Sequence, residues 1–328
     1  MRQHRAVLAI AGLLLLGLQP QSGHAQGRFP DRPITIIVPF AAGGPTDVVA
    51  RQLGEAMTRD LGVSVVSENV TGAGGTLGAQ RVAASRPDGS NLLLGNIGVA
   101  TAPSLFRRPP YDPLTQLDTV GLITPVPMIL VGRSDLPANT LPELLAWLRR
   151  PNAEVNIAHA GLGSASHLCA TLLRSILQTP MTAVAFRGTA PVMTEMMAGR
   201  IDITCDQTTN ALPYVQDGRI KAFAATTAER LAALPNVSTT AEGGLPQLQV
   251  TIWHGFYVAH GTPRPIIDRL SQSLRAALAD PAVVNRFREL ATAPEPPERA
   301  TPEAHRALLE SEITRWKPIL TAAGEYAD

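Results

Sequence analysis

The hydrophobic pattern divides the start of the chain into strand–loop–helix units. Residues 34–38 form a continuous apolar run rich in β-branched side chains, typical of a strand buried on both faces. Residues 48–53 have helical spacing, and Thr46 or Asp47 is expected to cap the helix that they belong to. Two glycines and two prolines lie between strand and helix. We expect them to leave backbone N–H groups accessible at the helix N-terminus.

A second unit of this kind follows directly. It has a strand at 63–69, a glycine loop at 72–76 and a helix at 77–85, and a third strand occupies residues 91–96. Strands that alternate with helices in this way predict an α/β fold with a mainly parallel sheet.

The same order recurs in the second half of the chain. A strand at 155–159 leads through a glycine loop to a helix at 166–177. The other apolar runs predict strands at 181–186, 201–205, 220–225 and 249–259 and helices at 141–149, 192–198, 263–278, 281–291 and 302–322.

Between the two halves, residues 119–131 resemble a strand but contain Pro125 and Pro127. Proline has no amide hydrogen to donate to a neighbouring strand, so we expect an edge strand or a segment that crosses into a second domain. The predicted division is a first domain at 26–124 and 249–328 and a second domain at 125–248.

The first 25 residues predict a secretory signal peptide. Arg2 and Arg5 precede an apolar run at 6–18, and a small-residue pattern ends at Ala25. The apolar run is short for a membrane span, and an uncleaved anchor is the alternative. We expect cleavage after Ala25 and a soluble protein in the periplasm.

Charge argues against one class of partner. Without Arg2 and Arg5, two of the 28 basic residues, the chain keeps 26 basic against 27 acidic side chains. The basic residues are scattered, without the basic stripe of a nucleic-acid surface, so no nucleic-acid partner is expected.

Two cysteines, Cys169 and Cys205, are present in a chain expected to face an oxidising compartment. A disulfide between them is one interpretation, and two small buried thiols are the other.

Helix-terminus physics makes the loop at 39–47 a candidate anion site. A helix N-terminus carries about half a positive charge and several unpaired N–H donors. Our hypothesis is that this loop holds a carboxylate.

Nucleotide and metal cofactors are not expected. The run from Gly72 to Gly78 fails the G-x-G-x-x-G spacing because Leu77 takes the third glycine position. The only lysines are Lys221 and Lys317, so no Walker loop exists, and the histidines show no metal-ligand spacing.

Polar residues in the second half suggest further candidates. Ser164 and Ser166 precede His167, which admits a serine hydrolase, although helix capping is the simpler interpretation. Arg187, Gly188, Thr189 and Asp206 follow predicted strands, where open α/β sheets bind ligands. Arg187 is expected to pair with a ligand anion or with Asp206, or to be solvated.

The whole mature chain resembles one family, the Bug-type extracytoplasmic receptors of tripartite tricarboxylate transporters, also called TctC-like. The similar stretches start at Ile37, Asn69, Arg86, Gly161, Phe186, Met197 and Gly261. The resemblance implies a type II periplasmic-binding-protein fold, in which two α/β domains with mainly parallel sheets close on a small ligand, commonly a carboxylate. Carried onto this chain, the ligand-binding residues are Ala42, Gly43, Gly44, Thr46, Asp47, Gly74, Gly75, Thr76, Gly161, Gly163, Ser164, Ser166, Arg187, Gly188 and Asp206. Where many relatives have tyrosine before Arg-Gly, this chain has Phe186.

We therefore expect a non-enzymatic, monomeric solute receptor that captures a small carboxylate and delivers it to membrane transporter subunits. A ligand sensor that signals to a membrane protein is the alternative, and a secreted serine hydrolase is a third class.

Overall fold

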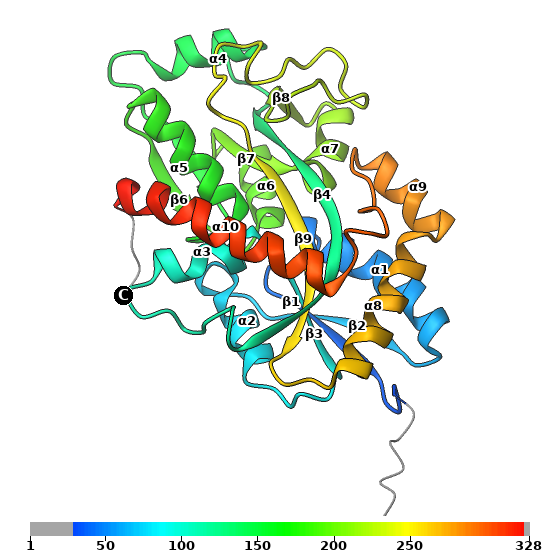
Figure 1. The fold of residues 1–328 in the computed structure, drawn as a ribbon. Helices are drawn as coiled ribbons and strands as arrows, with labels where there is room; N and C mark the ends of the chain where they lie inside the picture. Colours follow the sequence, from blue (N-terminus) through cyan, green and yellow to red (C-terminus); the bar gives the residue numbers. More distant parts are fainter. Residues whose placement is uncertain (1–28, 325–328) are drawn as a thin grey trace, which may run out of the picture.

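The computed structural model describes residues 29–324, and the predicted signal peptide lies outside them. Two lobes are joined by two long strands that run through the middle of the molecule (Figure 1). The strands are β1 (Ile34–Val38), β2 (Val65–Asn69), β3 (Asn91–Asn96), β4 (Leu117–Arg133), β5 (Asn156–His159), β6 (Thr182–Ala185), β7 (Ile203–Gln207), β8 (Ile220–Ala225) and β9 (Thr251–Ala259). The helices are α1 (Pro45–Leu61), α2 (Thr76–Ala83), α3 (Ile97–Leu105), α4 (Leu141–Leu148), α5 (Ala165–Leu177), α6 (Thr189–Met197), α7 (Thr208–Gln216), α8 (Arg264–Leu278), α9 (Pro281–Glu289) and α10 (Pro302–Ala323).

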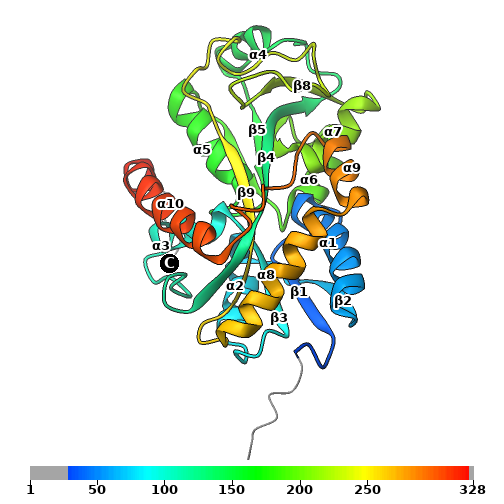
Figure 2. The same ribbon diagram turned by 45° about the vertical axis from the view of Figure 1, so that its right-hand side comes forward.

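The sheet of the first lobe has the strand order β2-β1-β3-β9-β4, and that of the second lobe has β8-β4-β7-β5-β6. Strands β1, β2 and β3 are parallel, as are β5, β6 and β7. Strands β9, β4 and β8 add antiparallel pairings. The carboxyl ends of the two parallel groups therefore point toward the junction of the lobes (Figure 2).

Strand β4 crosses from one lobe to the other, and its neighbours change on the way. Up to Pro127 it pairs only with β9, and Pro125 lies opposite Trp253. From Met128 onward it lies between β7 and β8. The prediction of a crossing segment is confirmed. Both prolines lie in the part of β4 that has a neighbouring strand on one side only. Proline is tolerated there because its missing N–H group is not needed for hydrogen bonds to a second strand.

Two helices were missed by the sequence pattern. Helix α3 is apolar almost throughout and contains Pro103, so it lacks the polar face of an amphipathic helix. Helix α7 begins directly after β7 and contains Pro213. A proline in the interior of a segment normally disfavours a helix there. In α3 and α7, packing on the sheet outweighs the low helix propensity of proline.

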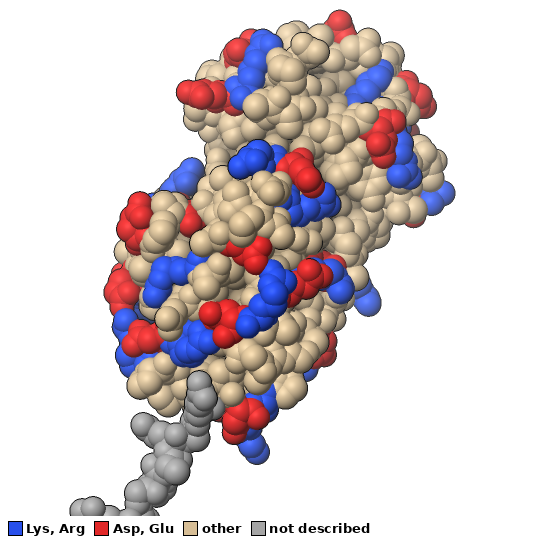
Figure 3. Space-filling view, turned by 90° about the vertical axis from the view of Figure 1, so that its right-hand side faces the viewer, with Lys and Arg blue, Asp and Glu red and all other residues tan. Residues whose placement is uncertain are grey.

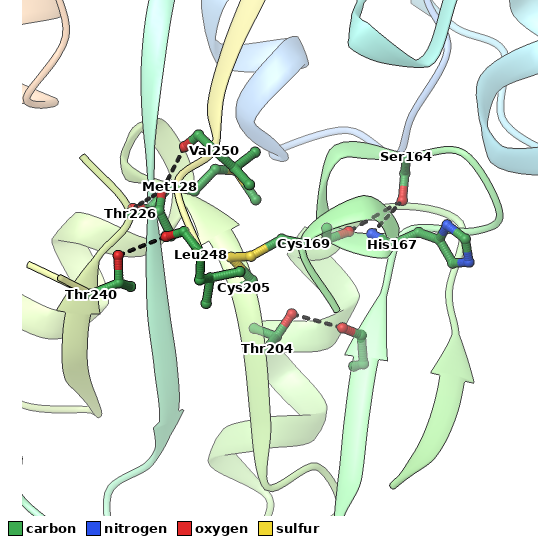
Figure 4. The surroundings of a disulfide bond; sticks show 12 residues. Met128, Ser164, His167, Cys169, Thr204, Cys205, Thr226, Thr240, Leu248 and Val250 are labelled. Atoms are coloured by element: carbon green, nitrogen blue, oxygen red, sulfur yellow. Dashed lines mark hydrogen bonds between the residues drawn. A yellow bond between two sulfur atoms is a disulfide. The ribbon is translucent and has the colours of Figure 1, made fainter. Parts of the chain in front are cut away.

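A disulfide joins Cys169 of α5 to Cys205 of β7, which decides between the two interpretations of these cysteines (Figure 4). Both residues are fully buried in the core of the second lobe. The bond ties α5 to the sheet on which it packs. It thereby anchors the helix whose first turn faces the other lobe.

The loop between β1 and α1 is held by Asp47, and the prediction that Thr46 or Asp47 caps α1 was wrong. Gly44 is the N-cap residue and Pro45 is the first helical residue. The Asp47 carboxylate instead accepts hydrogen bonds from Gly43 N at 2.9 Å and from Asn69 Nδ2 at 3.0 Å. It also pairs with Arg51 at 2.8 Å, so the aspartate fastens the loop from within the helix.

The surface carries mixed charge. On the face drawn in Figure 3, basic and acidic side chains are interspersed without a large patch of one sign. Within residues 29–324, no helix combines the length and the apolar character that a bilayer span requires.

The disulfide is expected to stabilise the protein. In the loop-entropy model, closing a loop with a sequence separation of 36 contributes about 3–4 kcal/mol. The double variant Cys169→Ala/Cys205→Ala should lose about this much free energy of unfolding in urea denaturation. Reductant should lower the urea concentration at the midpoint of unfolding for the wild type and leave that of the variant unchanged. An unchanged midpoint for the wild type would contradict a stabilising disulfide.

Asp47→Asn is expected to lower the free energy of unfolding by about 1–3 kcal/mol at pH 7, because the loop loses charge-assisted hydrogen bonds. Burial raises the pKa of Asp47, but the hydrogen bonds from Arg51, Gly43 and Asn69 outweigh it and hold the pKa below its ordinary 3.8. A lowered folded-state pKa contributes stability above the unfolded-state pKa and loses it in acid. The difference between variant and wild type should therefore shrink below about pH 4.

Chemical denaturation across pH 3–8 measures this effect. Glu55→Gln, an exposed carboxylate on the same helix, is the control and should follow the wild type. A pH-independent difference for Asp47→Asn would contradict the assigned role of the Asp47 charge.

Candidate ligand site

Helix N-termini from both lobes surround a small cavity at their junction. The cavity is lined by Phe40, Pro45, Thr46, Asn96, Ala160, Ser164, Ala165, Ser166, Thr189, Asp206 and Gln207. These residues include the first turn or the N-cap residue of α1, α3, α5, α6 and α7. Five helix dipoles therefore present their positive ends to one small volume.

Backbone donors for an anion come from α1 and α5, one helix from each lobe. The amides of Thr46 and Asp47 fall in the first turn of α1, and those of Ala165 and Ser166 fall in the first turn of α5. Such amides have no partner within their own helix. Thr46, Ala165 and Ser166 line the cavity, which gives it the donors that a carboxylate requires.

The two serines have structural hydrogen bonds. Ser164 caps α5, because its Oγ accepts from His167 N at 3.2 Å (Figure 4). Ser166 Oγ accepts from Ala160 N at 2.9 Å and so fixes the loop before the helix. His167 Nδ1 accepts from Gly163 N at 3.2 Å. This arrangement matches capping rather than the serine–base pairing that nucleophilic catalysis requires.

Asp206 is a buried carboxylate in the cavity wall, with 1% of its surface exposed. Burial raises its pKa to about 6, and hydrogen bonds from Asn210, Thr189 and the Gln207 backbone oppose the rise. Asn210 Nδ2 donates to Asp206 Oδ2 at 2.5 Å. The expected pair with Arg187 is not formed, since the Arg187 side chain is exposed and lines neither of the two cavities at the junction.

Cations contribute nothing to the described lining of the cavity. None of its lining residues is Lys or Arg. His254 lies behind Thr46, with its Nε2 3.5 Å from Thr46 Oγ1, and burial lowers its pKa to about 3. The imidazole is therefore neutral at physiological pH. In the described part of the chain, no cluster of three or more His, Cys, Asp or Glu side chains is arranged to hold a metal ion.

A second small cavity adjoins the first, and Phe40 and Asn96 line both. Its walls include the predicted glycine loop, Gly74 to Thr76, and otherwise consist mainly of apolar side chains around Tyr111. If a ligand carboxylate occupied the first cavity, the rest of the ligand could extend into this mostly apolar second cavity.

The two lobes touch largely through backbone atoms. Ala41 N donates to Arg187 O at 3.0 Å, and Thr101 Oγ1 donates to Gly163 O at 3.3 Å. A Cβ on Gly74 would lie 1.7 Å from Leu162 O. Since real Cβ atoms do not approach an oxygen so closely, the contact exists only because position 74 is glycine.

Some of the predicted site residues line one of the two cavities, and the others line neither. Thr46, Ser164, Ser166 and Asp206 line the first cavity, and Gly74, Gly75 and Thr76 line the second. Ala42, Gly43, Gly44, Asp47, Gly161, Gly163, Arg187 and Gly188 line neither, and they build or join the loops instead.

Sequence reasoning missed Asn96 and Gln207 as lining residues, whereas Thr189, which it singled out with Arg187 and Gly188, does line the first cavity. Asn96 and Gln207 end strands β3 and β7, and Thr189 begins α6. Their position after a strand was the available signal, because ligands of open α/β sheets bind outside the carboxyl ends of strands.

Comparison with known proteins gives a consistent result. A family model described as the tripartite tricarboxylate transporter family receptor matches residues 49–324. The UPF0065 protein in the TAR-I ttuE-ttuC' intergenic region of Agrobacterium vitis is 42% identical over 316 residues, which cover 96% of this chain and 91% of that protein.

Solved structures agree with this assignment. The periplasmic binding protein BugD superposes with a TM-score of 0.89 at 41% identity, covering 92% of this chain and 100% of that one. MatC from Rhodopseudomonas palustris with bound malate gives a TM-score of 0.86 at 38% identity, covering 89% and 100%. The fold and the family resemblance predicted from the sequence are confirmed. The chain belongs to the tripartite tricarboxylate transporter receptor family of periplasmic solute-binding proteins.

Proposed function

We propose that this protein is a monomeric periplasmic receptor that encloses a small carboxylate between its lobes and delivers it to membrane transporter subunits. A signal peptide cleaved after Ala25 exports it, and the two lobes correspond to the predicted domains. The receptor itself performs no chemistry on its ligand.

One observation carries the proposal: amides from the first turns of α1 and α5 meet at one cavity whose lining contains no Lys or Arg. Backbone donors at helix N-termini bind anions without a charged side chain. The malate bound to the 38%-identical MatC supports a carboxylate ligand.

Contacts between the lobes support a closed state of the proposed receptor. The lobes meet at the hydrogen bond from Ala41 to Arg187 and at the contact of Gly74 with Leu162. Strands β4 and β9 connect the lobes at this junction, so bending there would open the site to solvent (Figure 2). Ligand capture by hinge closure follows from this arrangement.

Isothermal titration calorimetry of the exported protein with a panel of small carboxylates and matching neutral amides tests the proposal. We expect binding of at least one carboxylate at micromolar concentration or below, with its amide at least tenfold weaker. Binding of none of the carboxylates, or equal binding of the amides, would refute it.

Gly74→Ala is expected to weaken ligand binding about tenfold or more, because the added Cβ would overlap Leu162 O and keep the lobes apart. Gly218→Ala is the matched control. Gly218 has a φ of +68°, close to the +65° of Gly74, but a Cβ there meets nothing within 4 Å. Both variants carry similar backbone strain, and calorimetry should detect lost affinity only in the first. Equal losses would assign the effect to strain.

A further inference from the structure

Thr226, which directly follows β8 in the second lobe, holds both of the strands that connect the lobes. Its amide donates to Met128 O of β4 at 2.9 Å, and its buried Oγ1 lies 3.1 Å from the same oxygen. This Oγ1 also donates to Val250 O at 2.5 Å, and Val250 N donates to Thr226 O at 3.2 Å (Figure 4). Val250 directly precedes β9. One threonine therefore fastens both connections to the second lobe.

The segment between α9 and α10 fastens β4 to the first lobe. Thr124 Oγ1 donates to Ala293 O at 2.7 Å, and Thr292 Oγ1 donates to Pro125 O at the same distance. Helix α9 before this segment contributes to the core of the first lobe, and α10 after it packs on α3. Strand β4 is therefore held to the first lobe up to residue 125.

Helix α10 holds β9 to the first lobe in a similar way. The buried ring of His305 lies against Gly255, where a Cβ would come within 2.3 Å of the His305 Cε1 atom. The same ring contacts Trp253 and Tyr257 edge-on, with ring centroids 5.7 Å and 4.4 Å apart. The imidazole thus fills a notch that the glycine leaves in the strand. Strand β9 is therefore held to the first lobe from residue 253 onward.

Two short stretches lie between these fastened positions, residues 126–127 of β4 and residues 251–252 of β9. They lie opposite each other in the antiparallel ladder, and β4 acquires its neighbours in the second lobe directly after them. The ring of Pro127 also fixes one of the backbone angles there. Bending that keeps all of the hydrogen bonds above is therefore confined to these two stretches.

We propose, resting on the receptor function proposed above, that these two stretches are the hinge of the protein and that Thr226 and Thr124 are positioning residues that fix its two ends. A short hinge limits the orientations that the open lobes can adopt. The N-termini of α1 and α5 then return to the same relative position at each closure. Less conformational entropy is lost when a ligand is enclosed, so the two hydroxyls favour binding without touching the ligand.

Pulsed electron–electron resonance between spin labels on the two lobes measures the spread of their orientations. Ala146→Cys on α4 and Ala276→Cys on α8 place labels at exposed positions on opposite lobes (Figure 2). Ala146→Cys combined with Asp217→Cys labels the second lobe twice and reports on its integrity. The native cysteines are joined in the disulfide and take no label. The exported protein is freed of ligand by unfolding in guanidinium chloride and refolding.

Thr226→Val keeps the shape of the side chain and removes its hydroxyl. The distribution of distances between the lobes should become at least about 1.5-fold wider, because the two connections lose a shared hydrogen bond. Thr124→Val should widen it from the side of the first lobe. Thr226→Ser keeps the hydroxyl and should match the wild type.

Thr204→Val is the matched control. Thr204 is also a buried threonine of the second lobe, and its hydroxyl donates to Ala158 O at 2.8 Å (Figure 4). That hydrogen bond joins β7 to β5 and involves neither connecting strand. The distance distribution of this variant should match that of the wild type.

Unchanged widths in both Thr226→Val and Thr124→Val would overturn the proposal, and so would equal widening by Thr204→Val. Widening of the distribution within the second lobe would also overturn it, because the Thr226 hydroxyl would then hold that lobe together rather than limit the hinge. The measurement requires no ligand. Absence of carboxylate binding would therefore refute the receptor function alone, whereas unchanged distance distributions would refute the hinge alone.

Discussion

The direct approach of backbone to backbone at the junction of the lobes is the constraint on which this structure depends. Leu162 O lies where a Cβ of residue 74 would be, and Ala41 N donates to Arg187 O. Such contacts require loops without bulky side chains, which explains their glycine content. The same loops start helices, so the contact that closes the lobes also brings helix N-termini together around the cavity.

A site built in this way separates two tasks. In the proposed receptor, the backbone amides of α1 and α5 would hold the carboxylate, and because helices supply them, they do not depend on the identity of nearby side chains. The side chains in the cavity wall would then be free to contact the rest of the ligand. Asp47 and the disulfide of α5 serve the first task indirectly, because they fasten the loop and the helix that carry the amides.

The strand–glycine loop–helix units were predictable because their signals are local. Buried parallel strands are apolar runs, and the loops that follow them are rich in glycine. Helices α3 and α7 escaped prediction because their internal prolines and weak polar periodicity hide them, and only packing on the sheet stabilises them. Of the residues that line the first cavity, Thr46, Ser164, Ser166, Thr189 and Asp206 had been singled out from the sequence, whereas Asn96 and Gln207 needed the fold to bring strand ends together.

The sequence by itself determined the α/β class and the family, since both are indicated by short stretches of residues. Only the tertiary structure decided which groups face the cavity. Arg187 and Asp206 both follow strands, yet Asp206 is enclosed and paired with Asn210, and Arg187 faces solvent. The direction and burial of a side chain depend on residues distant in the chain, and only folding places those residues around it.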